Sequence, residues 1–487
     1  MSETLKNAEL LRRAEPIEEA LYEVRRKIYP RAVGGWFARW RVAAVLITQS
    51  VFYGTPWLPW NERQAVLFDL AARKFHIFGL VLWPQDFIYL TLLLVISALA
   101  LFLFTAVAGR LWCGYACPQT VYTEIFMWIE RKVEGDRQHR MKLDGGPFSF
   151  RRLRLKAAKH GLWIAIALWT GFTFVGYFTP VRELALEVAA LALGPWESFW
   201  ILFYGFATYG NAGWMREQVC MHMCPYARFQ SAMFDTDTLV ITYDRARGEP
   251  RGTRSRSTDA KATGLGDCVD CGICVQVCPT GIDIRNGLQY ECIGCAACID
   301  GCNQVMKKMG YPPGLIRYST ENALRRGWDF RQMMKRALRP RVLVYTAVLF
   351  AVTLGAAASL VLRVPLKVDV IRDRAGLARE VEGGKIENVY RLQIMNTEER
   401  SHRFIIKVTG SDDLEHLEIL TEAQPLEIGP VSARAVPVRV RAEPEHARRG
   451  SKRITFIVEA SDDEKHALPE IFSVKEKSSF FIPGESR

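Results

Sequence analysis

The chain has no cysteine before Cys113 and none after Cys302, although its 487 residues include 12 cysteines. The segment that follows Cys302 therefore has no thiol that an oxidising compartment could convert to a disulfide. The N-terminus lacks a short apolar core behind a basic stub, so we expect no cleaved secretory signal. The net charge of +12 is concentrated in segments that flank long apolar runs, which makes nucleic-acid binding a poor explanation for it.

Two runs of four cysteines share one spacing. The first is Cys268-x2-Cys271-x2-Cys274-x3-Cys278, and the second is Cys292-x2-Cys295-x2-Cys298-x3-Cys302. This is the bacterial ferredoxin spacing for 4Fe-4S clusters, in which the fourth cysteine of each run binds the other cluster. We therefore predict two 4Fe-4S clusters, one held by Cys268, Cys271, Cys274 and Cys302, the other by Cys292, Cys295, Cys298 and Cys278. A zinc site typically uses two pairs of ligands rather than two runs of four.

Five apolar stretches are candidates to cross a membrane as helices. They cover residues 42–57, 87–108, 162–178, 199–212 and 342–362. The N-terminus and the segments at 109–158 and 214–341 are rich in Lys and Arg, so the positive-inside rule places them in the cytoplasm. Five crossings then put the cysteine runs in the cytoplasm of a bacterium and the cysteine-free C-terminal segment in its periplasm.

The expected fold is a multi-domain membrane protein: a bundle of five transmembrane helices, a cytoplasmic dicluster ferredoxin insert and a C-terminal periplasmic β-sandwich of immunoglobulin type. The sandwich is predicted because short stretches such as 454–458 alternate apolar and polar residues between turn-rich gaps. It contains no obvious catalytic cluster, which favours a docking or structural module. The predicted boundaries are 1–41 for a cytoplasmic basic segment, 42–230 for two repeated hairpins, 231–340 for the insert, 341–363 for the fifth helix and 364–487 for the sandwich.

The two hairpins of the membrane part resemble each other, and each ends in Cys-x3-Cys-Pro. The motifs are Cys113 to Pro118 and Cys220 to Pro225. If a helix continues through each motif, its two thiols share one face. Four thiolates suit Cu(I), zinc or a further iron–sulfur cluster, and sulfur ligands favour Cu(I) in particular.

Nearby donors are weaker candidates. His222 and its flanking methionines could also bind copper, although membrane packing explains the methionines equally well. His76 is isolated in the loop at 58–85, where a hydrogen-bonding role is favoured over copper binding.

These motifs together give the chain a family resemblance. Residues 108–120 and 224–230, with the dicluster insert, resemble the FixG/CcoG (RdxA, RdxB) family, and the likeness extends over essentially the whole chain from about Tyr29. The resemblance implies an inner-membrane cupric reductase needed to assemble a C-type haem–copper cytochrome c oxidase. It also implies a copper-transporting P-type ATPase and periplasmic copper chaperones as pathway neighbours, and homodimers.

The resulting functional prediction is single-electron transfer from two clusters to Cu(II) near Cys113, Cys117, Cys220 and Cys224, with an unidentified electron donor. Two alternatives stay open. One is a quinol-linked electron relay to another redox partner, and the other is a non-catalytic copper chaperone or assembly scaffold.

Overall fold

The computed structural model describes residues 27–256, 264–373, 378–410, 414, 416–443, 450–461 and 473–483. Most of the basic segment expected at 1–41 lies outside the described residues. The chain divides into two compact units. We call them the cluster unit (residues up to 53, 100–174 and 194–346) and the sandwich unit (54–99, 175–193 and 347–487).

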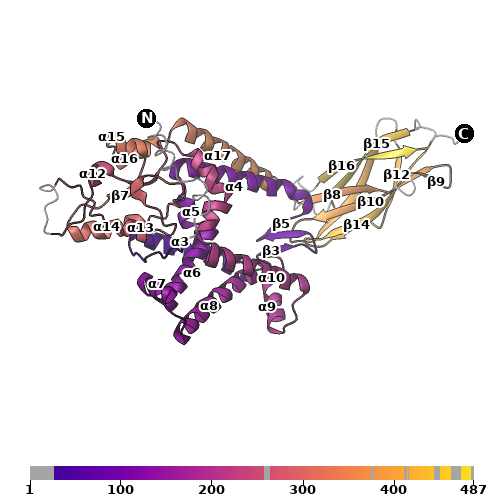
Figure 1. The fold of residues 1–487 in the computed structure, drawn as a ribbon. Helices are drawn as coiled ribbons and strands as arrows, with labels where there is room; N and C mark the ends of the chain where they lie inside the picture. The colour runs from indigo at the N-terminus through magenta and orange to yellow at the C-terminus, as the bar shows by residue number, and fades with distance from the viewer. Residues whose placement is uncertain are drawn as a thin grey trace, which may run out of the picture. The chain divides into compact units, whose positions relative to one another are not determined.

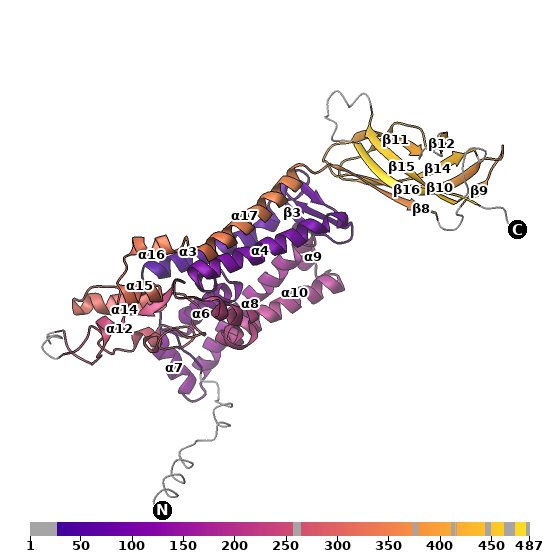
Figure 2. The same ribbon diagram turned by 90° about the horizontal axis from the view of Figure 1, so that it is seen from above.

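Long helices connect the parts of the chain (Figures 1 and 2). The principal helices are α3 (Trp36–Gly54), α4 (Phe87–Ala108), α6 (Pro118–Glu134), α7 (Arg137–Gly145), α8 (Phe150–Val175), α9 (Val181–Ala189), α10 (Pro195–Thr208) and α17 (Pro340–Val361). Short helical segments surround the cysteine motifs: α5 (Leu111–Tyr115), η3 (Tyr209–Met215), η4 (Val219–Met223) and α11 (Pro225–Met233).

Among the described residues, two helical stretches are long and apolar enough to cross a membrane, at 84–108 and 340–361. Their large apolar side chains lie exposed: Leu94 is 63% and Phe350 also 63% accessible. Soluble proteins rarely expose so large an apolar surface to water, so these helices indicate membrane association. In Figure 2, α17 runs alongside α4, consistent with the hydrogen bond from the Tyr89 hydroxyl to the Ser359 carbonyl.

The three other predicted spans are helical, in α3, α8 and α10, but they fall short of the same criterion. Helix α8 begins with a run of Arg and Lys before its apolar half, and α10 has 14 residues before the backbone widens into the π-helical η3.

The dicluster insert is a small fold around the cysteine runs. A two-stranded antiparallel sheet, β6 (Val240–Tyr243) with β7 (Ile316–Ser319), packs against α14 (Ala297–Met309) and the short α13 (Ile273–Gln276). The remaining helices of this part are α12 (Arg245–Gly248), η5 (Ile284–Asn286), α15 (Glu321–Arg326) and α16 (Phe330–Arg336). Five cluster cysteines are among the side chains packed at this core, together with buried Ile299, Met306 and Ile316.

The C-terminal residues form two facing antiparallel sheets, as the alternation predicts (Figure 1). One has the order β12-β14-β10-β8, with β9 also paired to β10, and the other β13-β11-β15-β16. The strands are β8 (Leu366–Arg372), β9 (Arg379–Glu380), β10 (Ile386–Asn396), β11 (His402–Gly410), β12 (Leu417–Leu420), β13 (Leu426–Ile428), β14 (Ala433–Ala442), β15 (Gly450–Ala460) and β16 (Ser473–Ile482). Val438, Phe404 and Phe456 fill the core between the sheets.

The segment expected as a loop at 58–85 is largely β-structure. Strands β3 (Val66–Asp69), β4 (Lys74–Ile77) and β5 (Leu80–Leu82) form an antiparallel sheet, next to the two-residue strands β1 (Pro59–Trp60) and β2 (Arg63–Gln64). Val66-Leu67-Phe68 is a short continuous apolar run of the kind found in strands, and the short turns between the strands let the sheet form where a plain loop was expected. The sheet buries His76 in strand β4.

Candidate functional site

The structure brings the eight predicted cluster cysteines to two separate cavities. Cys268, Cys271, Cys274 and Cys302 line one cavity. Cys278, Cys292, Cys295 and Cys298 line the other, which Cys274 also reaches. The sets are those expected from the crossed ferredoxin pattern, with each run's fourth cysteine at the other run's cavity. Four thiols around an otherwise mainly apolar cavity fit a 4Fe-4S cluster, so these residues would hold the two clusters, whose ligand assignment stays a prediction.

The cysteine runs bend at equivalent positions. Gly272 follows the second cysteine of the first run with φ 64°, and Ala296 does so in the second with φ 59°. Both residues have the left-handed backbone conformation. Gly272 precedes helix α13, and Ala296 precedes helix α14. A larger side chain is disfavoured in this conformation, which accounts for small residues at both turns.

The two Cys-x3-Cys-Pro motifs are also brought close to each other. The Cys113 thiol lies 3.3 Å from the Gln230 Oε1 on α11, the helix that follows the second motif. Gln119, at the start of α6, donates through its Nε2 to the Asn211 and Arg216 carbonyls, 3.0 Å each, just before that motif. The duplicated hairpins therefore bring the motifs together, as the internal repeat predicts.

The condition for a shared face, a helix that continues through each motif, is not met. Cys117 and Cys224 have extended backbones, with ψ 128° and 108°, and each precedes a new helix, α6 or α11. Pro118 and Pro225 cause this break, because a proline disfavours the helical conformation of the residue before it. Each second cysteine thus lies at the N-terminus of a new helix.

The four motif thiols are half-buried and affect one another. Burial, then the nearby Cys117 thiol, raises the pKa of Cys113 to about 12. Burial likewise raises the pKa of Cys220 to about 12, with Cys117 and Cys224 adding to it. A cation bound among these thiols would offset this cost, so bound metal is what would hold them as thiolates.

Among the described residues, no three His, Cys, Asp or Glu side chains are close enough to hold one metal ion. The motif thiols are thus neighbours rather than a preformed single-ion site. His222 belongs to η4 and is exposed, and Met223 is 57% exposed. His76 is buried, its Nδ1 accepts no hydrogen bond from the described residues, and burial lowers its pKa to about 4.

The first motif lies directly against the second cluster loop. An added Cβ on Gly114 would meet the Cα and N of Cys295 at 2.8 Å, so the two backbones touch where only glycine fits. Arg110 reinforces the contact. Its buried guanidinium donates to the Tyr290 carbonyl, to the Cys292 carbonyl at 3.3 Å, and to the Ala227 carbonyl on α11.

Helix α3 is fixed to the same loop. Asp300 of α14 accepts hydrogen bonds from the backbone N–H groups of Phe37 and Ala38, at 3.3 and 2.7 Å, and so caps α3 from a distant part of the sequence. Arg41, one turn later, donates to the Cys295 carbonyl at 2.6 Å. Sequence reasoning missed Arg110, Gly114 and Asp300. Only Gly114 had a signal, since it lies inside a cysteine motif.

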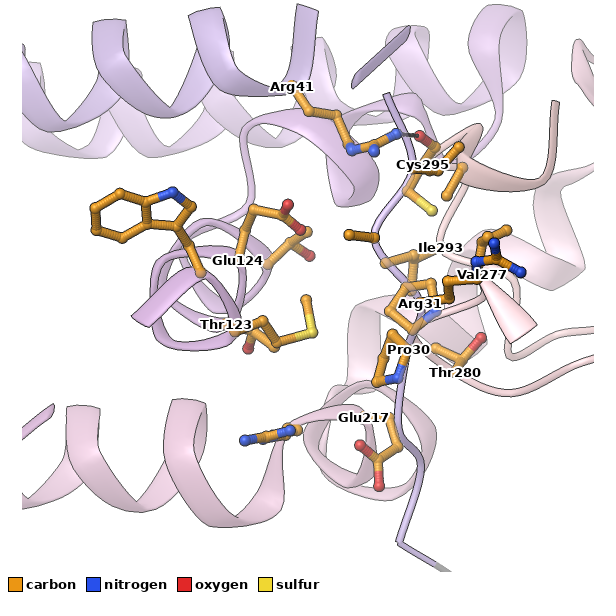
Figure 3. A pocket seen from close by; sticks show the side chains of 18 of the residues that line it. Pro30, Arg31, Arg41, Thr123, Glu124, Glu217, Val277, Thr280, Ile293 and Cys295 are labelled. Carbon is orange, nitrogen blue, oxygen red and sulfur yellow. Dashed lines mark hydrogen bonds between the residues drawn. The ribbon is translucent and has the colours of Figure 1, made fainter. Parts of the chain in front are cut away.

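A cavity connects the second motif with the second cluster loop. Cys220 and Cys295 both line it. Figure 3 shows Thr123 and Glu124 of α6 on one side, Ile293 and Cys295 on the other, and Arg41 with its hydrogen bond to Cys295. The arrangement places a space open to a small molecule beside residues of both redox motifs.

Comparison with known proteins gives three matching family models. Residues 215–321 match a 4Fe-4S dicluster domain, 356–483 match the "IG-like fold at C-terminal of FixG, putative oxidoreductase", and 90–134 match a 4Fe-4S binding domain. The nitrogen fixation protein FixG of Rhizobium meliloti is 41% identical over 414 residues, which cover 79% of each chain. The chain belongs to the FixG/RdxA/RdxB family.

Other proteins resemble the chain over different parts of its length. RdxA of Cereibacter sphaeroides is 39% identical over 408 residues, which cover 82% of this chain and 85% of RdxA. The ferredoxin-type protein NapH of Haemophilus influenzae is 25% identical over 44% of this chain and 68% of its own. A crystal structure of a FixG-related protein from Vibrio parahaemolyticus covers 24% of this chain and 95% of that one, at 24% identity and a TM-score of 0.20. As a member of this family, the chain is an iron–sulfur redox protein involved in electron transfer.

Proposed function

We propose that this chain is a membrane-bound oxidoreductase that reduces Cu(II) to Cu(I). The observation that carries the proposal is the backbone contact between Gly114, inside the first Cys-x3-Cys-Pro motif, and Cys295. It gives electrons a short covalent and packed route from the predicted cluster residues to Cys113 and Cys117. The clusters supply electrons one at a time when bound, which matches a one-electron substrate.

The motif residues have defined roles in this reaction. The thiols of Cys113, Cys117, Cys220 and Cys224 bind the copper, and their soft sulfur favours the monovalent product. Gln230 orients the Cys113 thiol, and Arg110 holds the first motif, α11 and the cluster loop in register through backbone carbonyls. Because the thiols are not preset for one ion, copper binding draws them together.

Contacts within each unit support five membrane crossings. In the cluster unit, Ala38 bonds to Asp300, and the Leu239 N–H donates to the Val107 carbonyl at the end of α4, 3.1 Å away. The chain therefore leaves and returns between these points, so α3 must cross if α4 does. In the sandwich unit, the Phe68 N–H donates to the Tyr177 carbonyl at 2.7 Å, beyond α8. By the same reasoning α8 and α10 each cross the membrane, one outward and one back. Helix α17 then makes the fifth crossing.

The pathway follows from the family likeness. We propose that Cu(I) from this reaction serves the copper centre of a C-type haem–copper cytochrome c oxidase. Its neighbours would be a copper-transporting P-type ATPase and periplasmic copper chaperones, with the protein working as a homodimer in the bacterial inner membrane. The sandwich would dock such a partner.

An anaerobic reaction tests the copper chemistry. The purified protein is reduced with dithionite, freed of excess reductant and mixed with Cu(II) and a Cu(I)-specific chelator. We expect stoichiometric Cu(I), with matching cluster reoxidation in visible and EPR spectra. The Cys113→Ser/Cys220→Ser variant should keep its clusters and lose this reaction. Clusters that stay reduced in the presence of Cu(II) would contradict the proposal.

A second candidate for the four motif cysteines is a further 4Fe-4S cluster. The family model of a 4Fe-4S binding domain covers residues 90–134, where Cys113 and Cys117 are the available cysteines. Each thiolate of a cluster binds a different iron, so its ligands stand farther apart than those of one ion, and no three of the described motif thiols are grouped closely enough for a single ion. Iron analysis separates the two: eight iron atoms per chain favour copper at the motifs, and twelve favour a third cluster.

A further inference from the structure

The cavity between the two redox motifs is lined by arginine, and we call it the arginine cavity. Its lining includes Arg31, Arg41, Arg131, Arg140 and Arg216, against the two carboxylates of Glu124 and Glu217. The cationic side chains thus outnumber the acidic ones at the place where a substrate would meet Cys220 and Cys295. The positive charge of this lining is an observation separate from the cysteine motifs.

The arginines divide into anchored and open ones. Arg140 and Arg216 are buried and bind the same Glu130 carboxylate oxygen, each at 3.0 Å. Arg41 is buried and donates to the Cys295 carbonyl. Arg31 and Arg131 have exposed side chains at the cavity. The anchored residues fix a positive wall, while the exposed ones can turn toward a ligand.

This lining opposes the entry of a bare cupric ion. A doubly charged cation beside several guanidinium groups is repelled, whereas a small anion is attracted and concentrated. Glu124 and Glu217 do not provide an alternative metal site, because no three acidic, His or Cys side chains of the described chain converge on one point. Guanidinium groups bind carboxylates and phosphates through paired N–H groups.

We propose that the arginine cavity binds copper as an anionic Cu(II) chelate, in which carboxylate ligands surround the metal. This inference rests on the proposed copper reduction and names the form of its substrate. The reduced clusters lose one electron and are thereby oxidised, and this electron converts chelated Cu(II) to Cu(I). Copper–carboxylate bonds break, a copper–sulfur bond forms at Cys220, and the proton of the Cys220 thiol passes to the departing chelator.

The chemistry of the two ligand sets drives the exchange. Carboxylate oxygen is a hard ligand that holds Cu(II) and binds Cu(I) weakly, whereas thiolate and thioether sulfur binds Cu(I) well. Cys220 and Met127 both line the arginine cavity, so sulfur is available on its wall. Reduction therefore moves copper from the chelator to the protein without a separate release step.

Two Cu(II) chelates of opposite charge test the inference on the full-length protein. Dithionite-reduced protein is mixed with Cu(II)–nitrilotriacetate, an anion, or with Cu(II)–tris(2-aminoethyl)amine, a cation. We expect cluster reoxidation to be about tenfold faster per unit driving force with the anion at low salt, and added salt to slow it. The Arg31→Gln/Arg131→Gln variant should lose most of this preference, and Arg31→Lys/Arg131→Lys should keep the salt dependence.

A control separates the cavity from general surface charge. Arg325→Gln, on α15 and outside the arginine cavity, removes one positive charge from a side chain that is 70% exposed and should change neither rate. Equal rates for the two chelates, or an equal effect of Arg325→Gln, would overturn the inference.

Calorimetry with zinc–EDTA, a redox-silent anion, covers the case in which neither copper chelate is reduced. Binding to the wild type that is lost in the double glutamine variant would support the cavity even if copper reduction failed. No binding to the wild type would overturn it.

Discussion

At the residue scale, Gly114 is held by close backbone contact within the site. Its added Cβ would lie 2.8 Å from three backbone atoms of Gly294 and Cys295, and backbone cannot rotate away as a side chain can. We expect Gly114→Ala to cost about 1–3 kcal/mol of stability and to slow cluster reoxidation by Cu(II). The measurements are thermal loss of the cluster absorbance and the stopped-flow rate. Gly161→Ala, inside α8 with nothing within 4 Å, is the matched control and should lower neither the stability nor the rate.

Glu387 gives a pH-dependent prediction in the sandwich. Burial acts to raise the pKa of Glu387, but hydrogen bonds from Arg441 and Arg379 outweigh it and hold the pKa below the ordinary 4.5. A lowered carboxyl pKa stabilises the fold above pH 4.5, and this contribution disappears as pH falls through the lowered value. Glu387→Gln should therefore lower the sandwich's unfolding temperature at pH 7 and have a smaller effect near pH 3, by circular dichroism. An equal loss at both values would contradict the ion-pair explanation.

Residue types with fixed spacing could be predicted, and residues that act through distant contacts could not. The ferredoxin pattern grouped Cys302 with the first run, because cluster geometry dictates the spacing. Arg110 serves three backbone carbonyls whose positions depend on how α11 and the cluster loop meet. A backbone carbonyl has no sequence signature. From the sequence alone, Arg110 therefore cannot be distinguished from the other basic residues that flank the membrane spans.

At the scale of elements, the junction of α3 with α14 depends on one carboxylate. Asp300 is buried and caps α3 by accepting from Phe37 and Ala38. We expect Asp300→Ala to cost at least about 1 kcal/mol, since a helix loses its N-cap and two partly buried N–H donors lose their acceptor. Loss of the cluster spectrum on heating measures the effect. Asp329→Ala removes the exposed N-cap of α16 and should leave the clusters' thermal stability nearly unchanged.

Helix ends show why the motif geometry was misjudged from spacing alone. An i to i+4 pair implies one helix face only if the backbone stays helical, and Pro118 and Pro225 prevent that at the preceding cysteines. The prolines were visible in the sequence, so the break was predictable. The packing partner of α6 was not predictable, because Gln119 donates to the Asn211 carbonyl in η3 and to the Arg216 carbonyl just after it.

At the scale of the whole molecule, the distribution of cysteine supplies a direct test of topology. All 12 cysteines lie in the range from Cys113 to Cys302. With five crossings, every one of these cysteines is on the cytoplasmic side. A cysteine introduced into the sandwich would then be the one thiol on the periplasmic side. Lys475 on β16 and Arg331 on α16 both have exposed side chains and suit such substitutions.

We expect Lys475→Cys to react with a membrane-impermeant maleimide in intact spheroplasts, and Arg331→Cys to react only after lysis. The reason is that an odd number of crossings separates the sandwich from the N-terminus, while α3 and α4 return the chain to the side of the clusters. Mass spectrometry of the labelled peptides distinguishes the new thiol from native Cys271, which is exposed. Labelling of Arg331→Cys before lysis would show that the orientation is the opposite of the proposed one. Labelling of both positions only after lysis would instead mean an even number of crossings, and α17 would then not be the fifth.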